Sequence, residues 1–337
     1  MPDYSVGVIG LGHMGSLHAK TFDDIAKCEL RALTDTDRKR AESVAAELKI
    51  GYNKVYDTHK EMLACEELDL ISVATPLGLH TDIVVDCILD RQINAVHCEK
   101  PMAASWNGCR QMVHEAEEAN TQLTFTHQSR FSEPVNVVKK LLDRGVIGSL
   151  QRIEISRRDL YESGIHQIDL CNYFVGDICI EWVLGAVDYH DREMVNGAHI
   201  EDQALSLWEY ENGVHGLACT GHGTDAVGAN QRLLGSNGII EIEFWTEEPV
   251  RILRYGEQWE RYTCSEDDPL QTAFEHVIKC LDTAEDPRIS GENALNGAEI
   301  AFATWESVRQ RRRIDLPLQI DDNPLRSMIA SDEISPD

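Results

Sequence analysis

The stretch Val6-Gly7-Val8-Ile9-Gly10-Leu11-Gly12-His13-Met14-Gly15 decides the fold, because it carries a Gly-x-Gly-x-x-Gly motif directly after a short apolar strand. Gly10 permits a tight turn, Gly12 lets a pyrophosphate approach the backbone, and Gly15 lets the next helix pack closely on the strand. The phosphates would then lie at the positive end of that helix. We predict that the residues holding them are Gly10, Gly12, His13, Met14 and Gly15. The motif indicates a dinucleotide-binding Rossmann domain, and a tight turn without a dinucleotide is the alternative.

An acidic residue follows the motif at the expected distance. Asp35 stands directly after the second apolar run, Cys28–Thr34. A carboxylate at this point accepts hydrogen bonds from the adenosine ribose hydroxyls and repels a 2′-phosphate. We therefore expect NAD as the cofactor rather than NADP, although Arg38 lies close enough in sequence to weaken that exclusion.

The first 125 residues alternate between short apolar runs and longer amphipathic ones. The predicted strands are Ser5–Gly10, Cys28–Thr34, Val55–Tyr56, Leu68–Ala74, Asn94–Cys98 and Gln122–Thr126. The predicted helices are Met14–Phe22, Arg38–Leu48, Lys60–Ala64, Thr81–Asp90 and Trp106–Ala119. Strands that alternate with helices form parallel βαβ units, so residues 1–125 are expected to fold as a doubly wound parallel sheet.

Beyond residue 126 the pattern changes to consecutive strands joined by turns such as Asn212-Gly213 and Asn237-Gly238. Such turns connect antiparallel strands. We expect residues 126–319 to form an α+β domain with a large, mostly antiparallel sheet, so that the whole chain is of the α/β class. For the C-terminal helix, Ala294–Gln310, packing back on the first domain is left open as an alternative. Residues 320–337 are expected to be a loose acidic tail.

Length and composition restrict the class of protein. A chain of 337 residues corresponds to about two ordinary domains. Its 42% hydrophobic and 26% charged residues are typical of globular proteins. No apolar run approaches the roughly 18 residues of a membrane span, and the N-terminus lacks the pattern of a secretory signal.

The charge is strongly negative, with 58 acidic residues against 31 basic ones and a net charge of −27. Such a surface repels phosphate backbones, so we expect no nucleic-acid partner. It suits either a high-salt cytosol, in which salt screens dense charge, or a merely acidic mesophilic enzyme. The ten cysteines form no metal-ligand spacing, which indicates reduced thiols in a cytoplasm and no metal site.

Two segments with polar residues follow predicted strands of the first domain. One is Ala74-Thr75-Pro76, which continues to His80, and the other is Glu99-Lys100-Pro101. Ligands of open parallel sheets collect at the carboxyl ends of the strands, so Lys100 is expected to point toward the nicotinamide position. An ordinary surface lysine is the alternative.

In order and spacing these motifs resemble the glucose–fructose oxidoreductase / inositol dehydrogenase (Gfo/Idh/MocA) family. Three further segments strengthen the resemblance, which extends over nearly the whole chain: Arg130-Phe131, Leu141 to Gly148, and Gly164-Ile165-His166-Gln167-Ile168-Asp169. The resemblance implies a Rossmann domain followed by a sheet domain that commonly mediates homodimers or homotetramers. The Lys100–Pro101 bond is expected to be cis.

The resemblance also implies the site residues. It assigns catalysis to Lys100 and His166, with Glu162 standing where the family usually has Asp. Cofactor contacts are expected from Ala74, Thr75, Pro76, His80, Glu99 and Lys100, with the phosphate-binding residues and Asp35. Substrate contacts are expected from Lys100, Arg158, His166 and Asp169. Three histidines on the cofactor side, His13, His18 and His80, are also interpreted as structural or positioning groups.

These assignments define a reaction. Oxidation of a carbinol requires that its proton leaves while hydride moves to nicotinamide; His166 would accept the proton and Lys100 would stabilise the alkoxide. We therefore expect an NAD-dependent oxidoreductase acting on a secondary hydroxyl of a sugar, cyclitol or derivative. The loop before His166 is shorter than in the family, which leaves the site open or closed by His190–Glu201 or Gly221–Asn230. A dinucleotide-binding regulatory protein without turnover is the alternative.

Overall fold

The computed structural model describes residues 2–90, 92–190 and 194–334 and divides into two compact units. The first unit comprises Met1–Ala104, Gly108–Thr126 and Leu270–Ala294, and the second comprises Ser105–Asn107, His127–Pro269 and Leu295–Asp337. No helix in the described part of the chain has the length and apolarity needed to cross a membrane.

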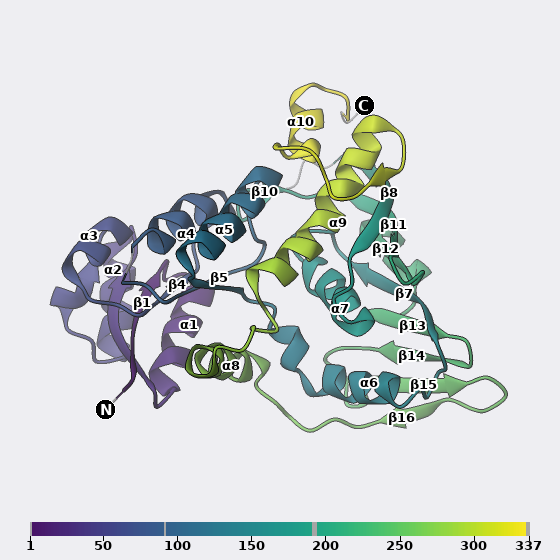
Figure 1. Cartoon of the computed structure of the whole chain (residues 1–337), viewed down its shortest axis with the longest axis horizontal. Coiled ribbons are helices and arrows are strands. Elements are labelled where there is room, and N and C mark those ends of the chain that lie inside the picture. Colours follow the sequence, from purple (N-terminus) through teal and green to yellow (C-terminus); the bar gives the residue numbers. More distant parts are fainter. Residues whose placement is uncertain (1, 91, 191–193, 335–337) are drawn as a thin grey trace. The chain divides into compact units, whose positions relative to one another are not determined.

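The first unit contains the six-stranded parallel sheet that the glycine motif predicted (Figure 1). Its strands are β1 (Tyr4–Ile9), β2 (Cys28–Thr34), β3 (Val55–Tyr56), β4 (Leu70–Val73), β5 (Ala95–Cys98) and β6 (Gln122–Phe125), in the order β3-β2-β1-β4-β5-β6. The chain runs outward from β1 in one direction and then restarts on its other side with β4. This reversal places a ligand position at the carboxyl ends of β1 and β4.

Helices pack around this sheet, and one of them comes from far along the chain. They are α1 (His13–Asp24), α2 (Arg38–Glu47), α3 (His59–Cys65), α4 (His80–Ile88), α5 (Trp106–Ala119) and α8 (Pro269–Thr283). Phe274 of α8 packs on Phe22 of α1, with ring centroids 4.5 Å apart. A boundary at residue 125 therefore divides the units only in part, because Leu270–Ala294 belongs with the first unit.

The second unit contains a nine-stranded sheet in the order β16-β15-β14-β13-β7-β12-β11-β8-β17. Its strands are β7 (Leu150–Arg157), β8 (Ile180–Asp188), β11 (Gln203–Tyr210), β12 (His215–Thr220), β13 (Gln231–Gly235), β14 (Gly238–Ile242), β15 (Val250–Arg254), β16 (Glu260–Tyr262) and β17 (Ile314–Asp315). Neighbours are antiparallel except β7 and β12, as the Asn-Gly turns predicted. A two-stranded hairpin, β9 (Met194–Val195) and β10 (Ala198–His199), lies outside this sheet.

Helices cover one face of the nine-stranded sheet (Figure 1). They are α6 (Glu133–Asp143), α7 (Ile165–Val175) and α9 (Gly291–Gln310), followed by α10 (Pro324–Ala330) near the C-terminus. The Tyr210 hydroxyl of β11 donates to Asn172 of α7 at 2.7 Å, and Ser206 of β11 bonds Thr304 of α9 at 2.6 Å. These contacts fix α7 and α9 against the sheet's inner side.

Two elements of the second unit differ from the sequence-based expectation. Helix α7 was not predicted, because most of its side chains are buried and its sequence therefore lacks an amphipathic period. The segment expected as a loose tail contains α10, whose Leu325 and Met328 are buried. Asp322 ahead of α10 pairs with Arg309 of α9 at 2.6 Å, which ties this segment to the second unit.

Candidate active site

The glycine turn between β1 and α1 has the geometry that a bound pyrophosphate requires. Gly10 has φ +84°, and a Cβ on it would lie 2.5 Å from the carbonyl oxygen of Ala74. A Cβ on Gly15 would lie 1.7 Å from the carbonyl oxygen of Gly10, whereas one on Gly12 would meet nothing within 4 Å. The first and third glycines are thus required by packing, and the second leaves open space above the backbone. No side chain caps α1, so its first amides face that space.

Asp35 is placed beside this turn. Its carboxylate is buried and accepts hydrogen bonds from the backbone N–H groups of Leu11 and Asp37, each at 2.7 Å. The end of β2 is therefore tied to the glycine turn by the residue expected to meet the ribose. Asp35 thus holds the turn in shape by its hydrogen bonds and also supplies the negative charge beside it.

The cation beside Asp35 is not the one that the sequence suggested. Arg38 pairs with Glu42 at 3.0 Å and with Asp57 at 3.4 Å. Arg40 instead approaches Asp35, with Nη1 3.4 Å from Oδ2. Both arginines begin the same helix, and only the helical geometry decides which one turns toward β2.

The segment after β4 supplies one polar atom without a partner. Thr75 Oγ1 is shielded from solvent and makes no hydrogen bond with any described residue. Buried hydroxyls are nearly always hydrogen-bonded, so an exception is a candidate contact for a bound group. Together with the open space at Gly12, it fits a dinucleotide at this edge of the sheet.

His80 joins the two strand-end segments instead of facing a ligand. Its ring is 1% exposed, with Nδ1 2.9 Å from the carbonyl oxygen of Pro101 and Nε2 2.8 Å from that of Thr75. Burial lowers the pKa of His80, although the two carbonyls favour its protonated form. These contacts agree with the positioning role expected for His80, and its expected cofactor contact stays a prediction.

Lys100 follows β5 and is half-buried, and the Lys100–Pro101 bond is cis as predicted. The neighbouring Glu99 is buried; its Oε2 accepts from the Lys100 backbone N–H at 3.1 Å and its Oε1 lies 2.9 Å from His18 Nε2. Burial alone would raise the pKa of Glu99, but the hydrogen bond and charge of His18, with the charge of Lys100, hold it below its ordinary value. Both carboxylate oxygens thus have partners inside the protein, and the expected cofactor contact of Glu99 stays a prediction.

In the second unit, His166 is the second residue of α7 and is half-buried. Its ring meets that of His127 edge-on, with centroids 5.8 Å apart. One turn further along α7, Asp169 is fully buried, and its Oδ2 lies 4.0 Å from His127 Nδ1. Lys100 belongs to the first unit and His166 to the second.

A buried arginine holds Asp169. Arg130 donates to Asp169 Oδ2 from Nε at 2.8 Å and to Oδ1 from Nη2 at 2.9 Å, and it also pairs with Asp177 at 2.7 Å. Burial opposes its charge, but the two carboxylates raise the pKa of Arg130 above its ordinary value. Because both oxygens of Asp169 accept from Arg130, this pair supports α7, and the expected substrate contact of Asp169 stays a prediction. Sequence reasoning noted Arg130 only as part of a motif and overlooked His127, which has no local signal.

The short loop before α7 is ordered by carboxylates. Asp159 Oδ1 accepts from the backbone N–H groups of Tyr161, Glu162 and Ser163 at 3.0, 2.6 and 3.1 Å. Glu162 in turn accepts from Asn196 Nδ2 at 3.2 Å, so the segment after β9 reaches this loop. Arg158 is exposed. Of the two segments expected to close this side, His190–Glu201 therefore contacts Glu162; its residues 191–193 lie outside the described residues.

Glu201 anchors the same loop from beneath. Its Oε1 accepts from the Leu160 backbone N–H at 2.5 Å, and its side chain is 2% exposed. Burial, with the nearby charge of Asp159, raises the pKa of Glu201 to about 8. A carboxyl group that is largely neutral at pH 7 thus supports the backbone ahead of Glu162.

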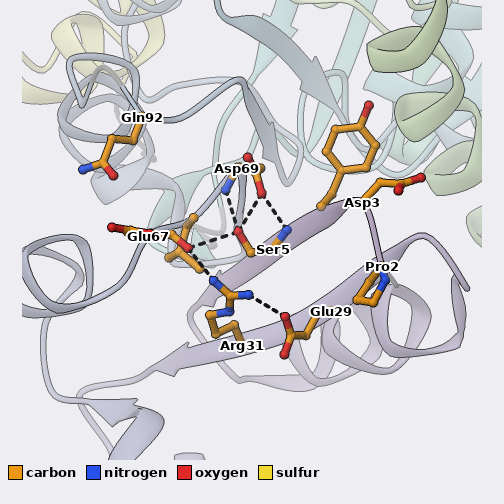
Figure 2. Close-up of a pocket in the computed structure, with 10 residues that line it drawn as sticks. Pro2, Asp3, Ser5, Glu29, Arg31, Glu67, Asp69 and Gln92 are labelled. Atoms are coloured by element: carbon orange, nitrogen blue, oxygen red, sulfur yellow. Dashed lines mark hydrogen bonds and ion pairs between the residues drawn. The ribbon is translucent and has the colours of Figure 1, made fainter.

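A hollow lies at the edge of the parallel sheet opposite the glycine turn, at the amino ends of the strands (Figure 2). The Ser5 backbone N–H and hydroxyl both donate to Asp69, at 2.8 and 2.7 Å. Arg31 pairs with Glu29 at 2.5 Å and donates to the carbonyl oxygen of Glu67 at 3.1 Å. Because these polar groups satisfy one another, this hollow does not present groups aimed at a ligand. Among the described residues, no cluster of three or more His, Cys, Asp or Glu side chains could hold a metal ion.

Comparisons with known proteins match both units. Residues 4–127 match the family model described as "Oxidoreductase family, NAD-binding Rossmann fold", and residues 156–316 match "Oxidoreductase family, C-terminal alpha/beta domain". The myo-inositol 2-dehydrogenase of Thermotoga maritima is 24% identical, and the alignment covers 92% of this chain and 98% of that protein. The D-apiose dehydrogenase of Paraburkholderia graminis is 25% identical, with coverages of 92% and 88%.

Solved structures share the fold. An NAD-binding oxidoreductase from Klebsiella pneumoniae has a TM-score of 0.80 at 17% identity and covers 94% of this chain and 100% of its own. A myo-inositol 2-dehydrogenase from Lactobacillus plantarum has a TM-score of 0.74 at 19% identity, with the same coverages. Both confirm a parallel Rossmann-type sheet followed by a large, mostly antiparallel one.

Proposed function

Because the chain belongs to the Gfo/Idh/MocA oxidoreductase family, with an NAD-binding Rossmann domain, we propose that it moves a hydride between NAD and a secondary hydroxyl or ketone of a sugar, cyclitol or derivative. The observation that carries this proposal is the uncapped glycine turn with open space at Gly12. Relatives named inositol and apiose dehydrogenases support the substrate class.

Each catalytic residue has a separate task. When bound, the nicotinamide ring accepts or donates the hydride. The imidazole of His166 takes the hydroxyl proton, a task suited to a group that changes charge near neutral pH. The ammonium of Lys100 stabilises the negative charge that develops on the carbinol oxygen. Glu162 orients the reacting groups from the loop that Asp159 orders.

The test separates binding from turnover. NADH fluorescence should report binding by the purified protein, and a screen of inositols and sugars at high KCl should find a substrate. Lys100→Ala should reduce kcat by about 10³-fold, because it removes a charge needed only in the transition state. Lys60→Ala is the matched control, since Lys60 is exposed and pairs with Asp86 on the surface.

The second candidate is a binding or regulatory protein that keeps the dinucleotide but has no turnover. The shortened loop before His166, which runs from Arg158 to Gly164, favours it. Tight NADH binding with no turnover on any polyol, and no effect of Lys100→Ala, would support this candidate over the enzyme.

We also propose that a second copy of the chain covers the outer face of the nine-stranded sheet. The register places Leu184, Leu207 and Leu217 side by side on β8, β11 and β12. Leu184 and Leu205 are 44% and 45% exposed on this face. Apolar sheet faces of this kind are usually covered by a partner.

Size-exclusion chromatography with light scattering measures the mass of the protein in solution and so tests this interface. Leu205→Lys should shift the mass toward one chain, because a charge would be buried without a partner. Leu89→Lys is the control, since Leu89 is 59% exposed at the end of α4 in the first unit. A single-chain mass for the unmodified protein would rule the interface out.

A reducing cytoplasm is the compartment that we propose for the protein. All ten cysteines are free, and seven of them are buried. Free thiols are typical of a reducing compartment, because an oxidising one favours disulfides. Burial raises the pKa of Cys28 to about 12, which keeps this thiol protonated and unreactive. Acid-quenched alkylation in cells followed by mass spectrometry should find ten thiols, and oxidised pairs would contradict the proposal.

A further inference from the structure

A chain of three buried polar side chains ends at the backbone of Lys100. Ser72 of β4 lies 2.9 Å from His18 Nδ1, and His18 Nε2 lies 2.9 Å from Glu99 Oε1. The other oxygen of Glu99 accepts from the Lys100 N–H at 3.1 Å. An ionised carboxylate can only accept, so Nε2 of His18 is the donor in this chain.

The chain is enclosed by the protein. Ser72 and His18 are 0% exposed, and Glu99 is 6% exposed. The ring of Phe274 from α8 stands edge-on to His18 at 4.9 Å. Charge-assisted hydrogen bonds that water cannot reach are stronger and more rigid than exposed ones. The same burial excludes Ser72 as a nucleophile, because no substrate can reach it.

A second buried histidine holds the opposite side of Lys100. His80 lies 2.9 Å from the Pro101 carbonyl oxygen and 2.8 Å from that of Thr75. The peptide unit before Lys100 is thus held by His18, through Glu99, and the carbonyl of the next residue, Pro101, is met by His80. Each histidine also contacts the β4 segment: His18 contacts Ser72 within the strand, and His80 contacts the carbonyl of Thr75 just beyond it.

We infer that His18 and His80 are positioning residues that clamp the backbone on both sides of Lys100 and so aim its ammonium group. The inference rests on the proposed function, in which Lys100 stabilises the alkoxide. Reacting groups must be held closely, and a misplacement of about 1 Å costs on the order of 10²-fold in rate. Without His18 the Glu99 carboxylate loses its fixed orientation, and the Lys100 segment becomes free to move.

Two substitutions at His18 test the clamp. His18→Leu removes the donor, and His18→Gln places an amide N–H near the position of Nε2. We expect His18→Leu to lower kcat by about 10–100-fold, to increase the primary deuterium isotope effect on kcat, and to leave the NADH Kd within about twofold. His18→Gln should recover most of kcat. Thr21→Ala on the same helix is the control, because the Thr21 hydroxyl donates to the Leu17 carbonyl of its own helix and not to the Ser72–His18–Glu99 chain.

Hydrogen exchange gives a readout that does not depend on turnover. The Lys100 amide should exchange faster in His18→Leu than in the unmodified protein or in Thr21→Ala, and His18→Gln should restore its protection. If His18→Leu does not fold, Glu99→Gln provides the same comparison, because it keeps the shape of the side chain and loses the charge.

The outcomes separate the clamp from the proposed function. Loss of kcat and of amide protection together, with NADH binding kept, supports the clamp. Unchanged protection and kcat in His18→Leu would overturn it, as would equal losses in the Leu and Gln variants that follow a loss of thermal stability. A protein without turnover on any polyol contradicts the proposed function, whereas the exchange result still decides the clamp.

Discussion

The segment around Lys100 and the segment around His166 position their side chains in different ways. Lys100 follows a parallel strand, and its support comes from neighbouring strand ends and from α1. His166 stands on a helix whose support is an ion pair with Arg130, a residue 36 positions earlier in the chain. The comparison teaches that the topology of a parallel sheet is enough to position a residue such as Lys100. The position of α7 depends instead on an ion pair with a residue from a distant segment of the chain.

Both regions bury a carboxylate, but the partners differ. Glu99 is met by an imidazole and a backbone amide, whereas Asp169 is met by a guanidinium that also holds Asp177. Removing one member of a buried ion pair leaves an uncompensated charge, which costs about 3–5 kcal/mol. The second region should therefore be the more sensitive to a single substitution.

The largest effect is expected from Arg130→Met. It leaves Asp169 buried without its cation, so the free energy of unfolding should fall by about 3–5 kcal/mol, as measured by urea denaturation. Arg254→Met is the control and should change little, because Arg254 pairs with Glu257 and Glu260 at the surface. A loss below about 1 kcal/mol, the size of an exposed pair, would contradict the difference between the two regions.

The glycine turn should separate packing from binding. Gly15→Ala places a methyl group 1.7 Å from the Gly10 carbonyl oxygen and should destabilise the protein by about 1–3 kcal/mol or more. Gly12→Ala meets nothing and should leave stability unchanged, while NADH affinity falls about tenfold for each 1.4 kcal/mol of lost contact. Thermal unfolding and NADH fluorescence measure the two effects. Equal stability losses in both variants would show that Gly12 is also a packing position.

A pH effect in the second region should arise through Glu201. Its pKa is raised to about 8 by burial and by Asp159, so the folded state keeps a proton that the unfolded chain has already released above its ordinary pKa. Stability should therefore fall as pH rises toward 8, by up to about 1.4 kcal/mol per pH unit. Glu201→Gln should remove this slope in urea denaturation from pH 5 to 9. The same slope in the variant would assign it to other groups.

The smallest expected effect concerns both regions alike. If the net charge of −27 reflects a high-salt cytosol, the melting temperature should rise with molar KCl, because salt screens the repulsion between carboxylates. Thermal scans from low to molar KCl measure it, and about 1 kcal/mol corresponds to roughly 2–4 °C in a unit of this size. A flat response would favour the merely acidic mesophilic protein.

Elements with a clear period could be predicted from the sequence. Cys28–Thr34 and Trp106–Ala119 have the bounds that the pattern predicted, because each has one buried side that its apolar residues mark. Helix α7 could not be found in this way, since its buried Asp169 and Asn172 read as polar positions although both have partners inside the protein. The helix that carries His166 and Asp169 was therefore not predicted from the sequence pattern.

Side-chain roles followed the same division. The positions of Asp35 and Lys100 followed from spacing, because a strand end determines where the next residue lies. Which arginine meets Asp35 depended on the rotation of α2, and the partner of Asp169 on an ion pair with a residue outside its helix. Neither is a property of a sequence window.

The sequence by itself determined the parallel sheet, the glycine turn and the cofactor class, because local spacing and strand order control these, whereas the residues proposed for catalysis came from the resemblance to the family. The tertiary structure alone decided that His18 and His80 hold the Lys100 backbone, that Arg130 neutralises Asp169, and that α8 completes the first unit. The physical reason is that buried polar groups must find partners wherever the fold brings them, and those partners are distant in the chain.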